Sequence, residues 1–392
     1  MKLAALELIP KLLGFRFAHA TDTAPPLPIN LTYSVTNLCQ SKCLSCNIWR
    51  FYRDEPQKFK EELKLDEVER VFRSFGHVYF FNISGGEPFL RTDLEDIVRL
   101  ACRHLTPQVI HCPTNVLCPK RVLAGTRKIL EIIREERPGT PFTIKPSYDG
   151  IGPEHDRIRG VKGNFDRLLE AVAGLKELKK EFPNLHLGLG TVISQYNIKD
   201  LPEISDYALK LGVDTYISEV AEERTEMKNT ASGMTPSADD YERAIQPFKR
   251  KIEETLPKLS GLARITQTLR TLYYDLTVKI LREKKQVIPC YGGISNAHMN
   301  PYGDIWPCAI LGYEKPMGNV REFDYDFPSV WRSERAQEVR RYIKAGNCAC
   351  PLANQSYANL LLHAPSAARA ALSMIRAPRP AAPPAPASTG AS

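Results

Sequence analysis

Residues Leu31–Trp49 read LTYSVTNLCQSKCLSCNIW and contain three cysteines, Cys39, Cys43 and Cys46. An apolar, β-branched run precedes them, so we expect a strand that ends in a cysteine-bearing loop. Such a loop can bring three thiolates to one soft metal centre. A cubane iron–sulfur cluster usually takes four thiolates, and the next cysteine is Cys102. The segment therefore predicts a 4Fe–4S cluster with one open iron; a zinc site completed by another ligand, or unligated thiols, are the alternatives.

The composition is typical of a large globular chain. The sequence has 392 residues, 43% hydrophobic and 25% charged, which is enough for one large core or two smaller ones. The net charge is +8, yet the basic residues stand in short scattered groups without an aromatic-interleaved stripe. We therefore expect no nucleic-acid partner. No stretch is long and apolar enough to cross a bilayer, so no transmembrane segment is expected.

The N-terminus carries a lysine, an apolar run and an Ala-His-Ala sequence, as signal peptides do. Glu7, Pro10 and Lys11 interrupt the apolar run, however, and its apolar residues recur at helical spacing. Residues 1–29 are therefore predicted to form an amphipathic docking helix and a linker. The ten cysteines stand largely in groups that indicate metal ligands rather than disulfides. A reducing, cytoplasmic location is the resulting expectation.

Strand and helix patterns alternate through residues 30–221. Short apolar runs predict the strands, and apolar residues at helical spacing fill the segments between them. This alternation predicts the α/β class, with a parallel sheet and helices packed outside it. The predicted strands cover residues 31–35, 78–83, 109–112, 142–144, 185–193 and 213–220.

Unusual polar sequences follow the first four predicted strands. Gly-Gly-Glu-Pro could by itself be a plain turn, but its place after a strand favours a functional site. Ligands bind at the carboxyl ends of parallel strands, so we expect these sequences to share one active site. In chain order they are the cysteine loop, Gly85-Gly86-Glu87-Pro88, Thr114-Asn115 and Ser147–Asp149.

Residues 222–289 are charged and helical, with apolar residues on one face of the later part. They are interpreted as a helical insertion, either a hairpin packed on the flank of the sheet or a lid over the site. Both remain open, because periodicity reveals a buried face and not what covers it. Glu219, Glu222 and Glu223 could face a substrate as acid–base residues, or they could be solvated loop carboxylates.

A second cysteine group occupies residues 290–355. Cys290 and Cys308 bracket a predicted hairpin, and Cys348 and Cys350 follow a predicted helix. Four thiolates can hold an iron–sulfur cluster, and structural zinc accepts the same four ligands. An iron–sulfur cluster and a zinc ion are therefore both candidates for this group.

The remaining cysteines and the C-terminal tail are assigned no chemistry. Cys102, Cys112 and Cys118 match no ligand spacing and are interpreted as ordinary thiols. Residues 356–392 are rich in alanine and then in proline. This tail is expected to be disordered at its end.

These motifs resemble those of the radical SAM superfamily over about residues 30–350. The three-cysteine loop resembles the superfamily's cluster motif, and Gly85-Gly86-Glu87-Pro88 resembles the motif that meets the methionine amino group of S-adenosylmethionine. The resemblance implies a partial (β/α)6 TIM-like barrel at residues 30–221. It implies a 4Fe–4S cluster on Cys39, Cys43 and Cys46, and S-adenosylmethionine bound by Gly85, Gly86, Glu87, Asn115, Ser147 and Arg159.

The second cysteine group resembles the short, twitch form of the superfamily's SPASM-like auxiliary-cluster domain. The resemblance implies one auxiliary 4Fe–4S cluster on Cys290, Cys308, Cys348 and Cys350. One residue separates Cys348 from Cys350, whereas a gap of two residues is commoner in that domain.

The resemblance implies an enzyme that receives an electron from a donor such as flavodoxin or ferredoxin. The cofactor is then cleaved to a 5′-deoxyadenosyl radical that abstracts a substrate hydrogen. Oxidation or rearrangement of a small polar substrate, such as a sugar or cyclitol, is the favoured outcome, because no appended peptide-recognition domain is visible. A peptide substrate is the alternative, and a non-catalytic zinc or iron–sulfur protein is the alternative of a different class.

Overall fold

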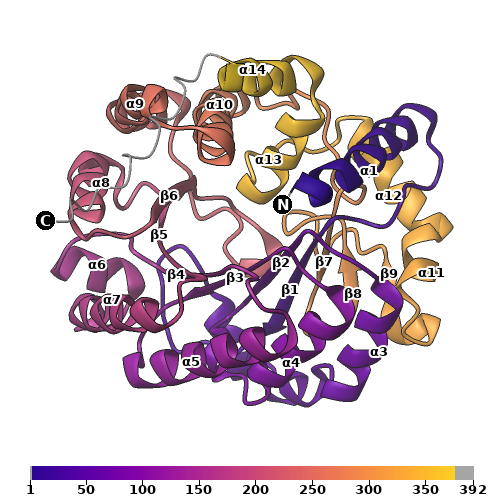
Figure 1. Ribbon diagram of the computed structural model, residues 1–392, viewed down its shortest axis with the longest axis horizontal. Coiled ribbons are helices and arrows are strands. Elements are labelled where there is room, and N and C mark those ends of the chain that lie inside the picture. Colours follow the sequence, from indigo (N-terminus) through magenta and orange to yellow (C-terminus); the bar gives the residue numbers. More distant parts are fainter. Residues whose placement is uncertain (1, 376–392) are drawn as a thin grey trace, which may run out of the picture.

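The computed structural model describes residues 2–375 of the chain (Figure 1). Within these residues a sheet of nine strands has the order β6-β5-β4-β3-β2-β1-β7-β8-β9. The first six strands pair in parallel. They are β1 (Asn30–Thr36), β2 (Phe80–Gly85), β3 (Val109–Thr114), β4 (Phe142–Pro146), β5 (Leu185–Ile193) and β6 (Thr215–Val220). The predicted α/β class and the six-stranded parallel partial barrel are confirmed.

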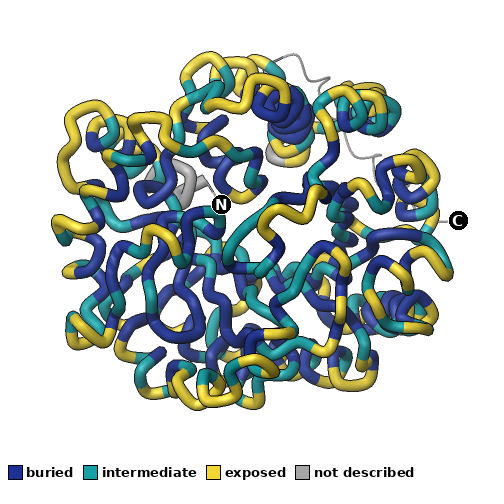
Figure 2. Tube along the Cα trace, turned by 180° about the vertical axis from the view of Figure 1, so that it is seen from behind, coloured by how far each residue is buried: buried dark blue, intermediate teal, exposed yellow. Residues whose placement is uncertain are grey.

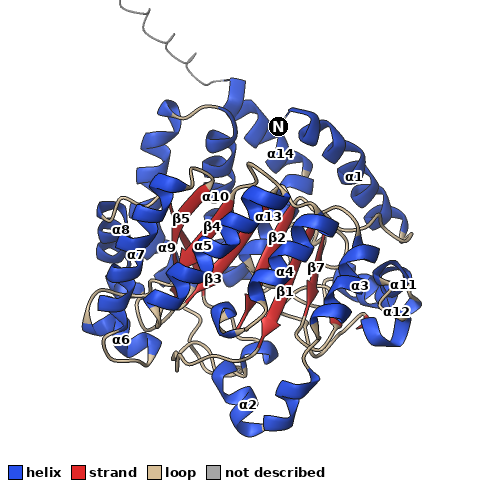
Figure 3. Ribbon diagram, turned by 60° about the horizontal axis from the view of Figure 1, so that its bottom comes forward, coloured by secondary structure: helices blue, strands red, loops and turns tan. Residues whose placement is uncertain are grey.

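Helices follow the strands and cover the outside of the sheet (Figure 3). Figure 2 shows the buried segments in the interior and the exposed ones on the outer faces of the helices. Parallel strands buried on both faces are rich in apolar side chains; in β1, for example, Tyr33 and Val35 are fully buried. The helices between the strands are α3 (Leu65–Phe75), α4 (Leu94–Leu100), α5 (Pro119–Glu136), α6 (Pro153–Arg159), α7 (Asn164–Glu181) and α8 (Leu201–Lys210), with the short α2 (Phe51–Asp54) after the cysteine loop.

The second cysteine region continues the barrel's own sheet. Strand β7 (Asn296–Met299) pairs in parallel with β1, with Tyr33 opposite Met299. Strands β8 (Asp304–Trp306) and β9 (Gly318–Asn319) then add antiparallel to it. The shared sheet fixes the second cysteine group relative to the first.

The segment 222–289 forms a loop and then two helices, α9 (Ala238–Thr255) and α10 (Gly261–Glu283). Helix α10 lies next to the edge strand β6. The Tyr274 hydroxyl is 3.1 Å from that of Ser218, and Arg270 donates to the carbonyl of Tyr216 at 2.9 Å. Helix α10 therefore packs on the flank of the barrel, against its edge strand β6.

The C-terminal residues are helical well past the predicted boundary at 355. Helices α11 (Phe327–Arg332) and α12 (Glu334–Lys344) precede the last two cysteines, and α13 (Ala353–Leu362) and α14 (Ala364–Ile375) follow them. The boundary falls inside α13, which belongs structurally to the cysteine region. The end of the tail, for which disorder is expected, lies outside the described residues.

The N-terminal residues form helix α1 (Lys2–Thr21). Phe15 on this helix is buried in a small cluster with Ile29 and Tyr291. An opposite row, Leu13 and Phe17, is more than half exposed, at 60% and 64%. The helix therefore covers the chain segments at the start of β1 and of the second cysteine region.

Candidate active site

The three-cysteine loop follows β1 and is held by the end of α6. Lys42 and Leu44 donate their backbone N–H groups to the carbonyls of Arg159 and Ile158, at 3.2 and 2.9 Å. Gly160 has a φ of +68°, and a Cβ there would lie 2.2 Å from the Lys42 carbonyl oxygen. Only glycine allows the two backbones to approach so closely.

The loop thiols are arranged to favour a positive centre. Burial, together with the neighbouring Cys43, raises the pKa of Cys39 and of Cys46 to about 12. Burial also raises the pKa of Cys43, against the nearby Arg159 guanidinium. Thiolates that repel one another are stabilised by a bound metal centre. The donor chemistry therefore fits the implied iron–sulfur cluster.

The Gly-Gly-Glu-Pro turn after β2 is bonded to the segment that enters the cysteine loop. Gly86 and Glu87 donate backbone N–H groups to the carbonyls of Thr36 and Leu38, at 2.7 and 2.8 Å. A Cβ on Gly85 would lie 2.2 Å from the Thr36 oxygen, and one on Gly86 2.3 Å from the Leu38 oxygen. The resemblance assigns both glycines to S-adenosylmethionine; the close approach that the structure contains is to the neighbouring backbone of Thr36 and Leu38.

Glu87 ties the ends of β2 and β3 together. Its side chain is 2% exposed and accepts hydrogen bonds from the Thr114 hydroxyl at 2.8 Å and from the backbone N–H groups of Asn115 at 2.7 Å and Phe89 at 3.2 Å. Burial raises the pKa of this carboxyl, and the three hydrogen bonds oppose the rise. Both carboxylate oxygens are thus engaged by the protein.

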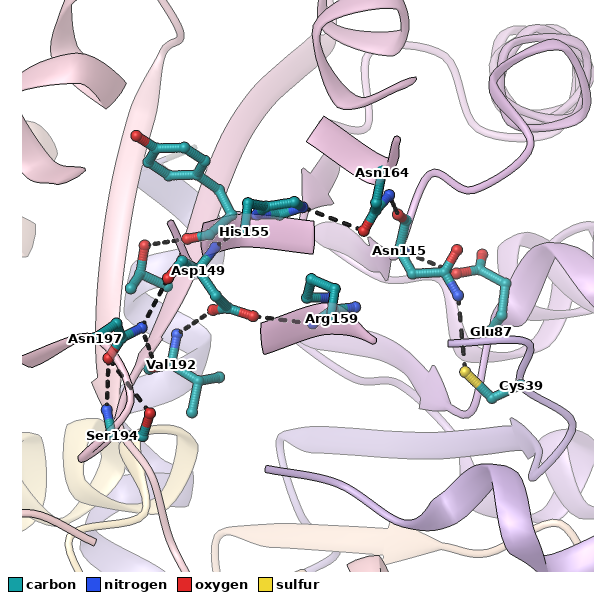
Figure 4. Close-up of polar contacts among 12 residues, drawn as sticks. Cys39, Glu87, Asn115, Asp149, His155, Arg159, Asn164, Val192, Ser194 and Asn197 are labelled. Carbon is teal, nitrogen blue, oxygen red and sulfur yellow. Dashed lines mark hydrogen bonds and ion pairs between the residues drawn. The ribbon is translucent and has the colours of Figure 1, made fainter. Parts of the chain in front are cut away.

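Asn115 lies between Glu87 and the cysteine loop (Figure 4). Its side-chain Nδ2 is 3.7 Å from Cys39 Sγ and 3.3 Å from the Gln40 side-chain oxygen. A hydrogen bond to a thiolate sulfur stabilises the charged form. Asn115 is therefore placed to orient Cys39.

Arg159 faces the cysteine loop from α6. It donates to Asp149 at 3.1 Å, and Asp149 in turn accepts from the Val192 N–H at 2.8 Å (Figure 4). The Nε atom of Arg159 is buried and has no hydrogen-bond partner among the described residues. A buried guanidinium N–H without a partner fits a carboxylate ligand such as that of S-adenosylmethionine.

A cavity at the carboxyl ends of the barrel strands reaches the second cysteine group. Its wall includes Gly85 and Ser147 from the ends of β2 and β4, and Cys308 from the second group. Lys145 also lines it, 3.6 Å from Glu219. A Cβ at Gly190 would lie 3.0 Å from the Lys145 side chain. The absence of a side chain at Gly190 therefore makes room for the Lys145 side chain.

The loop after β6 is tied to the three-cysteine loop. The Asn229 side chain donates to the Ser45 carbonyl at 2.8 Å. The Asn47 N–H donates to the carbonyl of Met227 at 2.8 Å. Two hydrogen bonds therefore join the two loops.

The carboxylates suggested as acid–base residues have different surroundings. Glu219 faces the cavity, whereas Glu223 accepts two backbone N–H groups of the following turn. Glu222 is buried, 3.9 Å from Arg224, and lines a groove with Cys350. Burial raises the pKa of Glu222 to about 7. Glu222 is thus not a solvated loop carboxylate, and Glu219 lies on β6 with its side chain 34% exposed.

The second cysteine group comes together from three separate segments. Burial, together with the neighbouring Cys290, raises the pKa of Cys308 to about 12 and of Cys348 to about 11. Burial also raises the pKa of Cys350, and Cys308 and Cys290 add to it. Backbone N–H groups of residues 310 and 311 hydrogen-bond Cys308. This shared electrostatic environment fits a cationic cluster. Among the described residues, no three His, Cys, Asp or Glu side chains are arranged around a single metal ion.

Two protein families match the chain. Residues 33–208 match the radical SAM superfamily, and residues 290–351 match SPASM, an iron–sulfur cluster-binding domain. The chain belongs to the radical SAM superfamily and carries a C-terminal SPASM domain. It is therefore a radical SAM enzyme that uses a 4Fe–4S cluster and S-adenosylmethionine, with an iron–sulfur site in the SPASM domain.

Relatives with similar sequences act in more than one pathway. The mycofactocin maturase MftC of Mycolicibacterium smegmatis is 25% identical, over 88% of this chain and 80% of its own. The AdoMet-dependent heme synthase of Methanosarcina barkeri is 24% identical, over 82% of this chain and 86% of its own. The structure of Streptococcus suis SuiB bound to precursor peptide SuiA has a TM-score of 0.57 at 17% identity, covering 87% of this chain and 72% of that one.

Two side chains of the site, Lys145 and Arg224, were not predicted from the sequence. Lys145 and Arg224 were not singled out, although a lysine inside a buried strand and glycines on the next strand are a readable signal. Arg224 sits in a loop without periodicity, and nothing local marks it. Within residues 2–375, no helix is both long and apolar enough to cross a membrane.

Proposed function

We propose that this protein is a peptide-modifying radical SAM enzyme with one auxiliary 4Fe–4S cluster. The observation that best supports this proposal is the similarity between this chain and the mycofactocin maturase MftC, which extends over 88% of this chain. SuiB, which shares the fold, is described as bound to its precursor peptide. The sugar-like substrate favoured from the sequence has less support from these relatives, and the peptide alternative takes its place. The heme synthase relative makes a haem precursor the second candidate.

In this proposal Cys39, Cys43 and Cys46 hold the cluster that binds S-adenosylmethionine. When bound, the cluster and S-adenosylmethionine supply a 5′-deoxyadenosyl radical. Arg159 receives the cofactor carboxylate at its free Nε, and Ser147 lines the space for the nucleoside. Gly85, Gly86, Glu87 and Asn115 act mainly by holding the cysteine loop and the turn in place.

The auxiliary cluster is assigned to Cys290, Cys308, Cys348 and Cys350. Cys308 forms part of the same cavity wall as Gly85 and Ser147. In this proposal a substrate held in the cavity contacts Ser147 and Gly85 at the ends of the barrel strands on one side and Cys308 of the second cysteine group on the other. That placement supports removal of a hydrogen atom at one end and of an electron at the other, which amounts to net oxidation. Flavodoxin or ferredoxin is the proposed electron donor.

Cofactor content and cleavage test the assignment of the two clusters. The protein is reconstituted with iron and sulfide without oxygen and incubated with dithionite and S-adenosylmethionine. We expect two clusters per chain and release of 5′-deoxyadenosine. Replacing Cys39, Cys43 and Cys46 by Ala should abolish cleavage and leave one cluster. Stoichiometric zinc in the anaerobically isolated protein would overturn the proposal.

Substrate class is tested by hydrogen transfer. Synthetic peptides with deuterated side chains, a deuterated coproporphyrin and deuterated sugars are supplied in parallel, and deuterium is measured in the 5′-deoxyadenosine. Transfer from a peptide, with a matching mass change of that peptide, supports the proposal. Transfer from the porphyrin or a sugar alone refutes it.

A further inference from the structure

Two carboxamide side chains outside the cysteine pattern reach the auxiliary thiols. Gln286, just after α10, donates from Nε2 to Cys348 Sγ at 3.8 Å and to the Ile343 carbonyl at 2.8 Å. Asn359, on α13, lines the same narrow space as Cys290. The Asn359 side chain is the hydrogen-bond partner of the Cys290 thiol.

The orientation of the Asn359 amide is set by its other partners. Its Oδ1 accepts the Tyr291 N–H at 2.9 Å and Gln355 Nε2 at 2.8 Å. With the oxygen engaged by two donors, the NH2 group is the part left for Cys290. Gln355 is 3% exposed and lines both the substrate cavity and the space around the auxiliary thiols.

N–H donors to cluster sulfurs favour the more negatively charged, reduced state. They also orient the ligands, as outer-shell hydrogen bonds do at other metal sites. Bonds in a buried amide chain polarise one another, so a donor to Asn359 Oδ1 strengthens the donation to Cys290. Loss of the Asn359 side chain should therefore change the reduction potential of the cluster more than loss of the Gln355 side chain.

We propose that Asn359 and Gln286 raise the reduction potential of the auxiliary cluster through hydrogen bonds to Cys290 and Cys348, and that Gln355 holds Asn359 in the donating orientation. The inference rests on the proposed function insofar as that site holds a cluster. All three are positioning residues. They come from α13 and from the end of the helical segment 222–289, so these parts of the chain complete the auxiliary site.

The experiment is a redox titration of the reconstituted full-length protein, followed by the EPR signal of the auxiliary cluster. The triple Cys39→Ala, Cys43→Ala, Cys46→Ala protein identifies that signal. Asn359→Leu and Gln286→Leu should each lower the midpoint potential, and Gln355→Leu should lower it less. Asn354→Leu, the same change at an exposed position of α13, is the matched control and should leave it unchanged.

A double-mutant cycle tests the role of Gln355. Gln355→Leu should shift the potential in the wild-type background and have no effect in the Asn359→Leu background. An equal shift in both backgrounds, or unchanged potentials in all three single variants, overturns the inference. If Asn359→Leu fails to fold, Asn359→Ala removes the donor without adding volume and should lower the potential in the same way. Absence of an auxiliary EPR signal and of its iron in wild-type protein refutes the proposed function instead.

Discussion

Gly86→Ala should loosen the three-cysteine loop without touching a cysteine. The new methyl group would lie 2.3 Å from the Leu38 carbonyl oxygen, and that oxygen belongs to the residue before Cys39. Ordinary van der Waals contact requires a displacement of about 1 Å. The turn and the loop are joined by backbone hydrogen bonds of 2.7 and 2.8 Å, and both would be strained or broken.

The expected cost follows from these contacts. Two backbone hydrogen bonds contribute about 1 kcal/mol each. Forcing a methyl group into closely packed backbone costs about 1–3 kcal/mol. The total of about 3–5 kcal/mol is a large part of the stability of a typical domain, about 5–15 kcal/mol, but leaves it folded. We therefore expect a folded protein with a displaced cysteine loop.

Urea unfolding of the unreconstituted protein measures the stability, and iron content with 5′-deoxyadenosine release measures the site. Gly86→Ala should lower the unfolding midpoint, lose the iron of the first cluster and cleave little S-adenosylmethionine. Gly292→Ala is the control for the unfolding midpoint alone, because its Cβ would meet no atom closer than 3.5 Å but would contact Cys290 of the second group. Wild-type stability and full cluster content in Gly86→Ala would refute the steric reasoning.

Three further predictions concern charged groups. Hydrogen bonding to Arg321 lowers the pKa of Glu67 to about 2 from 4.5, so its stabilisation is present above pH 4.5 and lost as the pH falls toward 2. Since Arg321 is 36% exposed, Glu67→Gln should cost only about 1–2 kcal/mol at pH 7 and flatten the acid limb of a pH–stability curve. Arg159→Lys should weaken S-adenosylmethionine binding by roughly 10–100-fold, measured by equilibrium dialysis, because one charge-assisted hydrogen bond is lost; unchanged affinity would contradict the carboxylate assignment. Lys145→Met should leave S-adenosylmethionine cleavage without substrate intact and lower substrate-dependent turnover, and an equal loss in both assays would show a role in cofactor binding instead.

The auxiliary site shows where sequence reasoning reached its limit. Cys290, Cys308, Cys348 and Cys350 were recognisable because metal ligands repeat a residue type at short spacing. Gln286 and Asn359 belong to the same site, yet each is a single amide in a helical or loop segment. Their contribution depends on where α10 and α13 pack, and that depends on side chains far away in the chain. The tail was therefore assigned no chemistry, although α13 supplies part of a wall around the second cysteine group.

The sequence by itself determined the strand–helix alternation, the cysteine loop after the first strand and the Gly-Gly-Glu-Pro turn after the second, because these are local patterns with a period or a fixed spacing. Only the tertiary structure decided that β7 extends the barrel sheet beside β1, since strand pairing joins residues more than 250 positions apart. That pairing brings Cys308 into the cavity wall that Gly85 and Ser147 share. The need for glycine at Gly85 and Gly86 is likewise visible only in the tertiary structure, because the backbone that leads into the cysteine loop leaves no room for a Cβ there.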